Sequence, residues 1–189
     1  MPRKARIDAP GALHHIIFRG IEGTAIFKDA LDYRNFIERL GNILEESSTP
    51  CLAWALLTNH VHLLLKTGTA PIATVMRRLL TGYAQQHNRR HKRQGHLFQN
   101  RYKSFLCEED LYLHELVRYI HLNPIRAGMI RDMKALNSYP HSGHSVLMGK
   151  ITHDWQDIDS VLELFGKTVR PARNSYLLSK IADHVFGSN

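Results

Sequence analysis

The order of strand-like and helix-like segments is the feature that most restricts the fold of this chain of 189 residues. Short runs rich in β-branched and aromatic residues predict strands, and apolar residues spaced three and four apart predict helices. The predicted order is strand, helix, strand, strand, helix, strand, helix. The strands are residues 12–20, 51–58, 60–68 and a fourth around 104–107; the helices begin at Asp29, Pro71 and Asp110 and end near residues 47, 87 and 124.

This order is that of an α+β, ferredoxin-like (split βαβ) antiparallel sheet with helices on one face. We expect one domain over residues 1–130. Residues 131–189 begin with a stretch rich in turn-forming residues and histidine. They predict a mainly helical C-terminal extension, irregular at first and then helical over 157–166 and 174–187. Because such a sheet supports many unrelated functions, the function has to be argued from particular residues.

The composition excludes several classes of protein. No apolar run approaches the roughly 18 residues that a membrane span needs, and the first residues lack the apolar core of a secretory signal. We therefore expect a cytoplasmic, nucleoid-associated protein with no membrane partner. The chain has two cysteines, Cys51 and Cys107, and no CxxC pair. This argues against a disulfide framework or a cysteine zinc site, and both are expected to be reduced packing residues.

Positive charge is concentrated in the middle of the chain. The formal net charge is +8, and no Asp or Glu occurs between Glu46 and Glu108. A field of this kind attracts a polyanion, and nucleic acid is the favoured partner. A solvated basic helix stays an alternative, and an anionic membrane surface is third because no Trp or Phe stripe accompanies the cations. The candidate DNA-binding residues are Arg77, Arg78, Arg89, Arg90, Lys92, Arg93, Arg101 and Lys103.

Two histidines stand inside the apolar run HVHLLLK. Residues two apart in a strand share one face, so His60 and His62 project together. Two neutral imidazoles side by side can begin a metal site, although they can also be ordinary surface residues. On the last predicted helix, Tyr119 and Asn123 share a face because they are four residues apart. Asn123 can supply a third ligand beside the Tyr119 hydroxyl; alternatively, Tyr119 packs half-buried and Asn123 only ends the helix.

The segments NHVHLLL and VRYIHLNPIRAG resemble the HUH single-tyrosine transposases, in particular the REP-associated tyrosine transposase branch. The resemblance spans about residues 8–149. It implies that His60 and His62 bind a divalent cation, that Tyr119 is the catalytic nucleophile and that Asn123 is the third metal ligand. Asn123 departs from the Gln or carboxylate found elsewhere among HUH proteins, so a water is the alternative ligand.

The resemblance also implies the reaction. A single-strand endonuclease and strand transferase of this family cuts and rejoins single-stranded or hairpin DNA through a 5′-phosphotyrosine intermediate. The metal would be Mg²⁺ or Mn²⁺, and neutral nitrogen ligands favour Mn²⁺ at least as strongly. Relatives act as monomers or as dimers that exchange the tyrosine helix, so a homodimer stays open for this chain.

Two other functions compete with strand transfer. One is a non-catalytic single-stranded nucleic-acid-binding module of ferredoxin-like fold. RNA-binding sheets display an aromatic-rich pair of central strands, and neither CLAWALLT nor HVHLLLKTG shows one. The other is a hydrolytic nuclease that uses the same metal with water as nucleophile.

The remaining histidines and aromatic residues have ordinary interpretations. Six histidines are expected to be surface residues or phosphate contacts: His14, His15, His87, His91, His96 and His121. A zinc site at His141, His144 and His153 is disfavoured because no cysteine or regular spacing accompanies them. Tyr83, Phe98 and Tyr102 are expected to stack DNA bases, and for Tyr83 and Phe98 packing in the core is an equal alternative.

Overall fold

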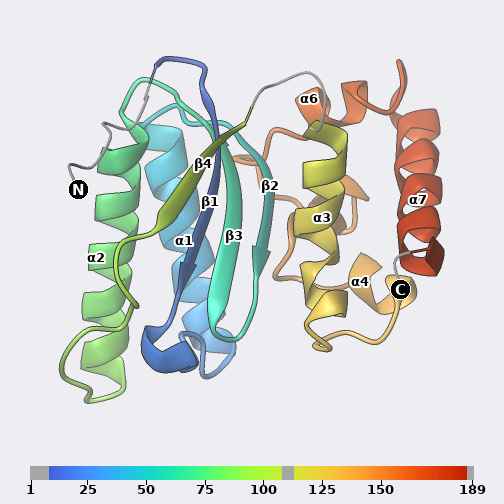
Figure 1. Ribbon diagram of the computed structural model, residues 1–189. Coiled ribbons are helices and arrows are strands. Elements are labelled where there is room, and N and C mark those ends of the chain that lie inside the picture. Colours follow the sequence, from blue (N-terminus) through green and yellow to red (C-terminus); the bar gives the residue numbers. More distant parts are fainter. Residues whose placement is uncertain (1–8, 108–112, 187–189) are drawn as a thin grey trace.

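Four strands form one antiparallel sheet in the order β2-β3-β1-β4 in the computed structural model (Figure 1). The structure describes residues 9–107 and 113–186, with side chains as far as residue 179. The strands are β1 (Leu13–Arg19), β2 (Cys51–Leu56), β3 (His60–Lys66) and β4 (Lys103–Cys107). Since β1 lies between β3 and β4, the two halves of the chain interleave as a split βαβ requires. The predicted fold class is confirmed.

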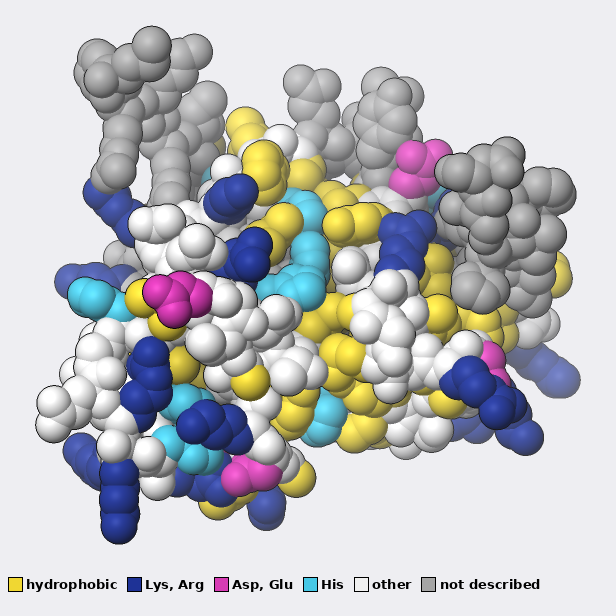
Figure 2. Space-filling model, turned by 60° about the horizontal axis from the view of Figure 1, so that its bottom comes forward, with side chains coloured by type: hydrophobic (Ala, Val, Ile, Leu, Met, Phe, Trp, Pro, Cys, Tyr) yellow, Lys and Arg dark blue, Asp and Glu magenta, His cyan; other side chains and the backbone are white. Residues whose placement is uncertain are grey.

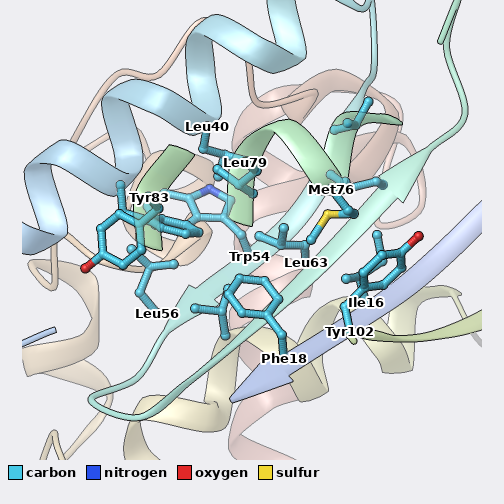
Figure 3. Close-up of a cluster of buried hydrophobic side chains, with 14 of the residues drawn as sticks. Ile16, Phe18, Leu40, Trp54, Leu56, Leu63, Met76, Leu79, Tyr83 and Tyr102 are labelled. Atoms are coloured by element: carbon cyan, nitrogen blue, oxygen red, sulfur yellow. The ribbon is translucent and has the colours of Figure 1, made fainter. Parts of the chain in front are cut away.

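Helices α1 (Ala30–Glu46) and α2 (Ile72–Arg90) cover one face of the sheet. Asp29 caps α1, because its Oδ1 accepts hydrogen bonds from the backbone N–H groups of the first turn. Figure 3 shows Trp54 and Leu63 of the sheet beneath Leu40 and Leu79 of these helices. This apolar layer is fully buried and anchors the sheet against α1 and α2.

The opposite face carries the later helices. They begin with α3 (Leu113–Arg126) and continue with α4 (Met133–Asn137), α5 (Gly143–Leu147), α6 (Ile158–Glu163) and α7 (Val169–Phe186); a short 3-10 helix, η1 (Ile21–Gly23), follows β1. Leu147 and Tyr176 of the extension share a second core with Leu52 of β2 and Val117 of α3. The extension therefore packs directly on the sheet, and the boundary at residue 130 remains a prediction. Among the described residues, no helix combines the length and apolar character that crossing a bilayer needs.

The end of α3 differs from the prediction. A stop near Pro124 was expected, but the helix runs to Arg126 with Pro124 inside it. A proline ring fixes φ near the helical value, but inside a helix it removes one backbone hydrogen bond and crowds the carbonyl four residues earlier. Pro124 is buried and its carbonyl accepts from the N–H groups of Met129 and Ile130, so packing holds the last turn together. The predicted N-cap, Asp110, lies outside the described residues.

Candidate active site

Strand β3 presents two histidines side by side on the face that α3 covers. Between and after them, Val61 and Leu63 point into the layer beneath α1 and α2. The rings of His60 and His62 have centroids 5.3 Å apart and are inclined by 72°. His62 is almost fully buried at 4% exposure, whereas His60 is half-buried. The alternation of the strand thus brings the two imidazoles together at the border between core and solvent.

Helix α3 places Tyr119 against these histidines. The Tyr119 ring centroid lies 5.8 Å from that of His62 and 6.1 Å from that of His15, and it meets both rings edge-on. Val117 and Ile120 of the same helix are fully buried, which fixes the helix on the sheet. Tyr119 itself remains 39% exposed. A substrate can therefore reach the phenol while the helix behind it stays rigid.

Asn123 lies one turn beyond Tyr119 on α3. Its Nδ2 donates to the Tyr119 backbone carbonyl at 2.9 Å, which leaves Oδ1 as the atom that can accept or ligate. The helix then approaches the turn between β2 and β3, where the Thr58 hydroxyl contacts the Met129 sulfur at 3.8 Å. This direction places Asn123 on the side of Tyr119 nearer to the start of β3, where His60 stands.

His15 also belongs to the site, although it is not among the site residues predicted from the sequence. Of its two expected positions, at the surface or on a phosphate, the surface position is wrong, because His15 is buried at 8% exposure. His15 Nε2 lies 3.1 Å from His62 Nδ1, and the two rings are stacked. A residue of β1 can meet His62 only through the pairing of β1 with β3, and no local signal in the sequence reveals that pairing.

Asn59 fixes the protonation of His60. Its Nδ2 donates to the Gly23 carbonyl at 3.0 Å, so its Oδ1 faces His60 Nδ1 at 2.7 Å. An amide oxygen only accepts, so Nδ1 of His60 carries the hydrogen and Nε2 keeps its lone pair. Hydrogen bonding of one ring nitrogen in this way is typical of histidines that ligate a metal through the other.

The electrostatics of the cluster fit a divalent cation. Burial, with neighbouring His15 and His60, lowers the pKa of His62 to about 3. Burial also lowers the pKa of His15 to about 4, and burial together with Arg19 lowers the pKa of His60. All three imidazoles are therefore neutral at pH 7, as metal ligation requires. The residues that could hold the ion are His60, His62 and, through its amide oxygen, Asn123.

A positive charge stands over the tyrosine. The guanidinium carbon of Arg126 lies 5.2 Å from the Tyr119 ring centroid, within the range of a cation–π contact. Arg126 is exposed and comes seven residues after Tyr119, so the two lie on the same side of α3. An anion that approaches the phenol meets this charge.

Comparisons with known proteins identify the family of this chain. A family model described as "Transposase IS200 like" matches residues 10–123. The chain belongs to the IS200-like transposase family. It shares its fold with a REP-associated tyrosine transposase solved bound to a REP hairpin, at a TM-score of 0.61 and 16% identity over 84% of this chain and 93% of that one. The family predicted from the two motifs is confirmed.

A second solved structure and the curated proteins were also compared with this chain. A putative transposase from Deinococcus radiodurans R1 has 19% identity and a TM-score of 0.45, covering 65% of this chain and 97% of its own. Among curated proteins, no sequence matches this transposase chain.

The predicted DNA-binding cations are spread over two faces of this transposase. Arg77, Arg78, Arg89 and Arg90 lie on α2, behind the sheet as seen from Tyr119, and Lys92 and Arg93 follow that helix. Arg78 pairs with Glu46. Of the eight residues, Lys103 stands on the site's face of the sheet, and Arg101 is exposed just before it. In the view of Figure 2, histidine side chains gather in a band with Lys and Arg side chains beside it.

A second histidine cluster lies between α1 and α2. By geometry, Asp32, His87 and His91 could hold a metal ion, because one ligand atom from each lies within 4.8 Å of the others. However, the buried Asp32 carboxylate already accepts from Arg90 Nη1 at 2.5 Å and from the Lys28 N–H at 2.9 Å. A guanidinium at this distance opposes a cation at the same carboxylate. We therefore treat this cluster as an ion-pair network that ties the start of α1 to the end of α2.

Several other histidines are buried where a surface position was expected. His14 is buried with Nδ1 3.1 Å from the Ser104 hydroxyl, and His87 is buried between the helices. His121 is fully buried and its Nδ1 lies 2.6 Å from the Tyr176 hydroxyl. The surface interpretation is wrong for these three, because pairing of distant segments covers them.

Two histidines and three aromatic residues remain from the sequence predictions. His91 is half-buried in the ion-pair network, and His96 is exposed. Tyr83 is buried in the main core and Phe98 packs against it, which favours their core interpretation. Tyr102 is buried in the same core at 8% exposure, so the expectation that it stacks DNA bases is wrong.

Proposed function

We propose that this chain is a DNA single-strand endonuclease and strand transferase with Tyr119 as its nucleophile. One observation carries the proposal: an exposed phenol on a rigid helix lies in ring contact with His62 and His15, beside His60. Catalysis by a covalent intermediate needs a nucleophile held next to groups that stabilise the charge of the transition state. Membership of the IS200-like transposase family agrees with this chemistry.

The proposed reaction is an exchange of phosphodiester bonds. The Tyr119 oxygen attacks the phosphorus in line, the bond from phosphorus to O3′ breaks, and the phenol proton is lost while O3′ gains one. The products are a free 3′-hydroxyl and a 5′-phosphotyrosine. A second 3′-hydroxyl can reverse the step and join new strands without an external energy source. Arg126, above the phenol, would hold a non-bridging phosphate oxygen during the attack.

The site has residues for a divalent cation. His60 and His62 would hold it through Nε2, and Asn123 through Oδ1, with Asn59 and His15 orienting the two imidazoles. When bound, a divalent cation offsets the charge that develops on the phosphoryl oxygens. Either Mg²⁺ or Mn²⁺ would serve, and two imidazole nitrogens favour Mn²⁺.

The proposed substrate is single-stranded or hairpin DNA. Tyr119 projects from a helix packed on a sheet, and a phosphate inside a regular duplex would be shielded from it. The structurally similar REP-associated transposase was solved bound to a REP hairpin, which supports a substrate of this class here. Because Tyr119 lies against His62 of its own chain, we propose that one chain completes the site, whether or not two chains associate.

A covalent-adduct experiment tests the proposal. The full-length protein is incubated with Mn²⁺ and a pool of DNA hairpins with randomised single-stranded flanks, labelled at either the 5′ or the 3′ end. On a denaturing gel, 3′-labelled DNA should become attached to protein, whereas 5′-labelled DNA should be released as a shorter strand. Tyr119→Phe should abolish attachment, and Tyr102→Phe, at a buried tyrosine, should retain it.

Each other result points to a different function. Cleavage that survives Tyr119→Phe, with no protein attached, would indicate a hydrolytic nuclease. Binding of the hairpins with no cleavage in any variant would favour a non-catalytic binding module.

A further inference from the structure

Helix α3 covers only half of its face of the sheet. It packs mainly on β2 and to a smaller extent on β3. Leu13 and His15 of β1 point to the same face and are buried, but the side chains nearer to the end of β1 and on the adjoining part of β4 remain accessible. Arg19, Lys103 and Phe105 are exposed, and Ile17 is half-buried. We call these four residues the open half-sheet.

Strand pairing joins the open half-sheet directly to the candidate active site. In the register of β1 with β3, Arg19 lies opposite His60 and Ile17 opposite His62. In the register of β1 with β4, Ile17 lies opposite Lys103 and His15 opposite Phe105. Residues opposite each other in a sheet have neighbouring side chains, so the histidines and the open half-sheet form one continuous surface.

Phe105 is the unusual member of this surface. It is 52% exposed on an edge strand, and its ring centroid lies 6.2 Å from that of His15. The Tyr119 ring stands 6.1 Å from the same histidine. An exposed aromatic ring so close to a nucleophile, and unused by the hydrophobic core, is suited to stacking against a planar group.

The charges beside Phe105 indicate which planar group. Lys103 is two residues away on the same face of β4, and Arg19 stands at the end of β1 beside His60. An aromatic ring between cations matches the alternation of bases and phosphates along a single strand of nucleic acid. In a duplex the bases are already stacked and the ring would find no partner.

We propose that Phe105 stacks on a base of the DNA strand next to the phosphate that Tyr119 attacks, with Lys103 and Arg19 holding neighbouring phosphates. This inference rests on the proposed function and adds to it the path of the strand: across β4 and β1, over the open half-sheet, and into the histidine site. It also makes the bound segment single-stranded at this position.

Binding measurements with the uncleaving Tyr119→Phe protein test the proposal. The probe is a fluorescent DNA hairpin with a randomised single-stranded flank, and fluorescence anisotropy gives its affinity. Adding Phe105→Ala should weaken binding about 5- to 150-fold, the equivalent of one lost base stack. Phe105→Trp should retain the affinity. The matched control is Leu106→Ala, since Leu106 is 50% exposed on the same strand but points to the other face.

Two further measurements locate the strand. With 2-aminopurine at successive positions of the flank, one position should change its fluorescence on binding, and Phe105→Ala should remove that change. Lys103→Gln should reduce the slope of log affinity against log salt by about 0.7, the value for one phosphate contact on a single strand.

The outcomes separate this inference from the proposed function. If the protein with Tyr119 intact forms the covalent adduct but Phe105→Ala binds as tightly as its parent, the stacking proposal is overturned while strand transfer stands. If no adduct forms yet Phe105→Ala weakens binding, the nucleotide subsite stands and the transferase fails. Equal losses for Phe105→Ala and Leu106→Ala would indicate a general effect on the strand and would also overturn the subsite.

Discussion

His15 Nε2 lies 3.1 Å from His62 Nδ1, and the two rings stack with centroids 5.3 Å apart. The contact joins two neighbouring strands, since His15 belongs to β1 and His62 to β3. It occupies one nitrogen of His62 and sets the angle of the ring, and so it leaves Nε2 as the nitrogen that can bind a cation. His15 is thus a positioning residue for the candidate metal site.

Replacing His15 should weaken metal binding without unfolding the protein. Loss of the hydrogen bond that orients a metal-binding histidine typically costs 10- to 100-fold in affinity, so we expect about that loss of Mn²⁺ affinity for His15→Ala. His15→Gln, which restores a hydrogen-bonding group, should recover part of it. Electron paramagnetic resonance of free Mn²⁺ measures the affinity, with the exposed His96→Gln as control. Unchanged Mn²⁺ affinity in His15→Ala would refute the role.

Asn59 should dictate the tautomer of His60. Since Asn59 Oδ1 accepts from Nδ1 of His60, long-range ¹H–¹⁵N spectra of the metal-free protein should show hydrogen on Nδ1. Asn59→Ala should mix the two tautomers and lower Mn²⁺ affinity by about tenfold. This is the lower end of the range for loss of a residue that hydrogen-bonds a metal-binding histidine. A His60 ring that carries its hydrogen on Nε2 in the unaltered protein would contradict the assignment.

Gln156 should connect the C-terminal extension to the sheet. Its Oε1 accepts from the Trp54 indole N–H at 2.8 Å, its Nε2 donates to the Gly143 carbonyl at 3.0 Å, and both side chains are buried. Gln156→Ala leaves these groups without a partner, and each such loss costs about 1–3 kcal/mol of unfolding free energy. Urea unfolding followed by tryptophan fluorescence measures it. Gln94→Ala, at an exposed glutamine, should change the value by less than about 0.5 kcal/mol.

His141 should make stability depend on pH. Its ring stacks on Tyr33 at 4.0 Å, and burial lowers the pKa of His141 to about 4. Between about pH 6.5 and pH 4 the unfolded chain binds a proton at this histidine and the folded chain does not, so the unfolding free energy falls as pH decreases through that window. His141→Phe keeps an aromatic ring that can stack on Tyr33 but cannot bind a proton.

The slope of stability against pH should therefore be smaller in His141→Phe. The reduction for one proton is at most about 1.4 kcal/mol per pH unit. Urea unfolding at several pH values from 7 to 4.5 measures both slopes. Identical slopes in the two proteins would show that His141 takes up no proton on unfolding.

Some parts of the fold and the site were predictable because they depend on neighbouring residues. The cap at Asp29 and the start of α2 after Pro71 are local, and so is the common face of His60 and His62. The spacing of Tyr119 and Asn123 on one helical face is local as well. Each of these features depends only on residues close together in the chain, through capping or through the periodicity of side chains along a strand or helix.

Other parts were beyond such reasoning. His15 was expected to be a surface residue or a phosphate contact, and its contact with His62 depends on the register of β1 against β3. Arg90 is one of the predicted DNA-binding residues, and its ion pairs with Asp29 and Asp32 of α1 depend on the packing of α1 against α2. The continuation of α3 past Pro124 depends on the burial of its last turn. All three arise from segments far apart in the chain.

The sequence by itself determined the order of elements, the two faces of each strand and the family to which the chain belongs, because local periodicity and short motifs encode them. Only the tertiary structure decided which histidine contacts His62, that Asn59 contacts His60 and Arg126 contacts Tyr119, and which half of the sheet α3 leaves open. These depend on strand register and helix packing, which are set by contacts between distant segments and not by any residue's neighbours along the chain.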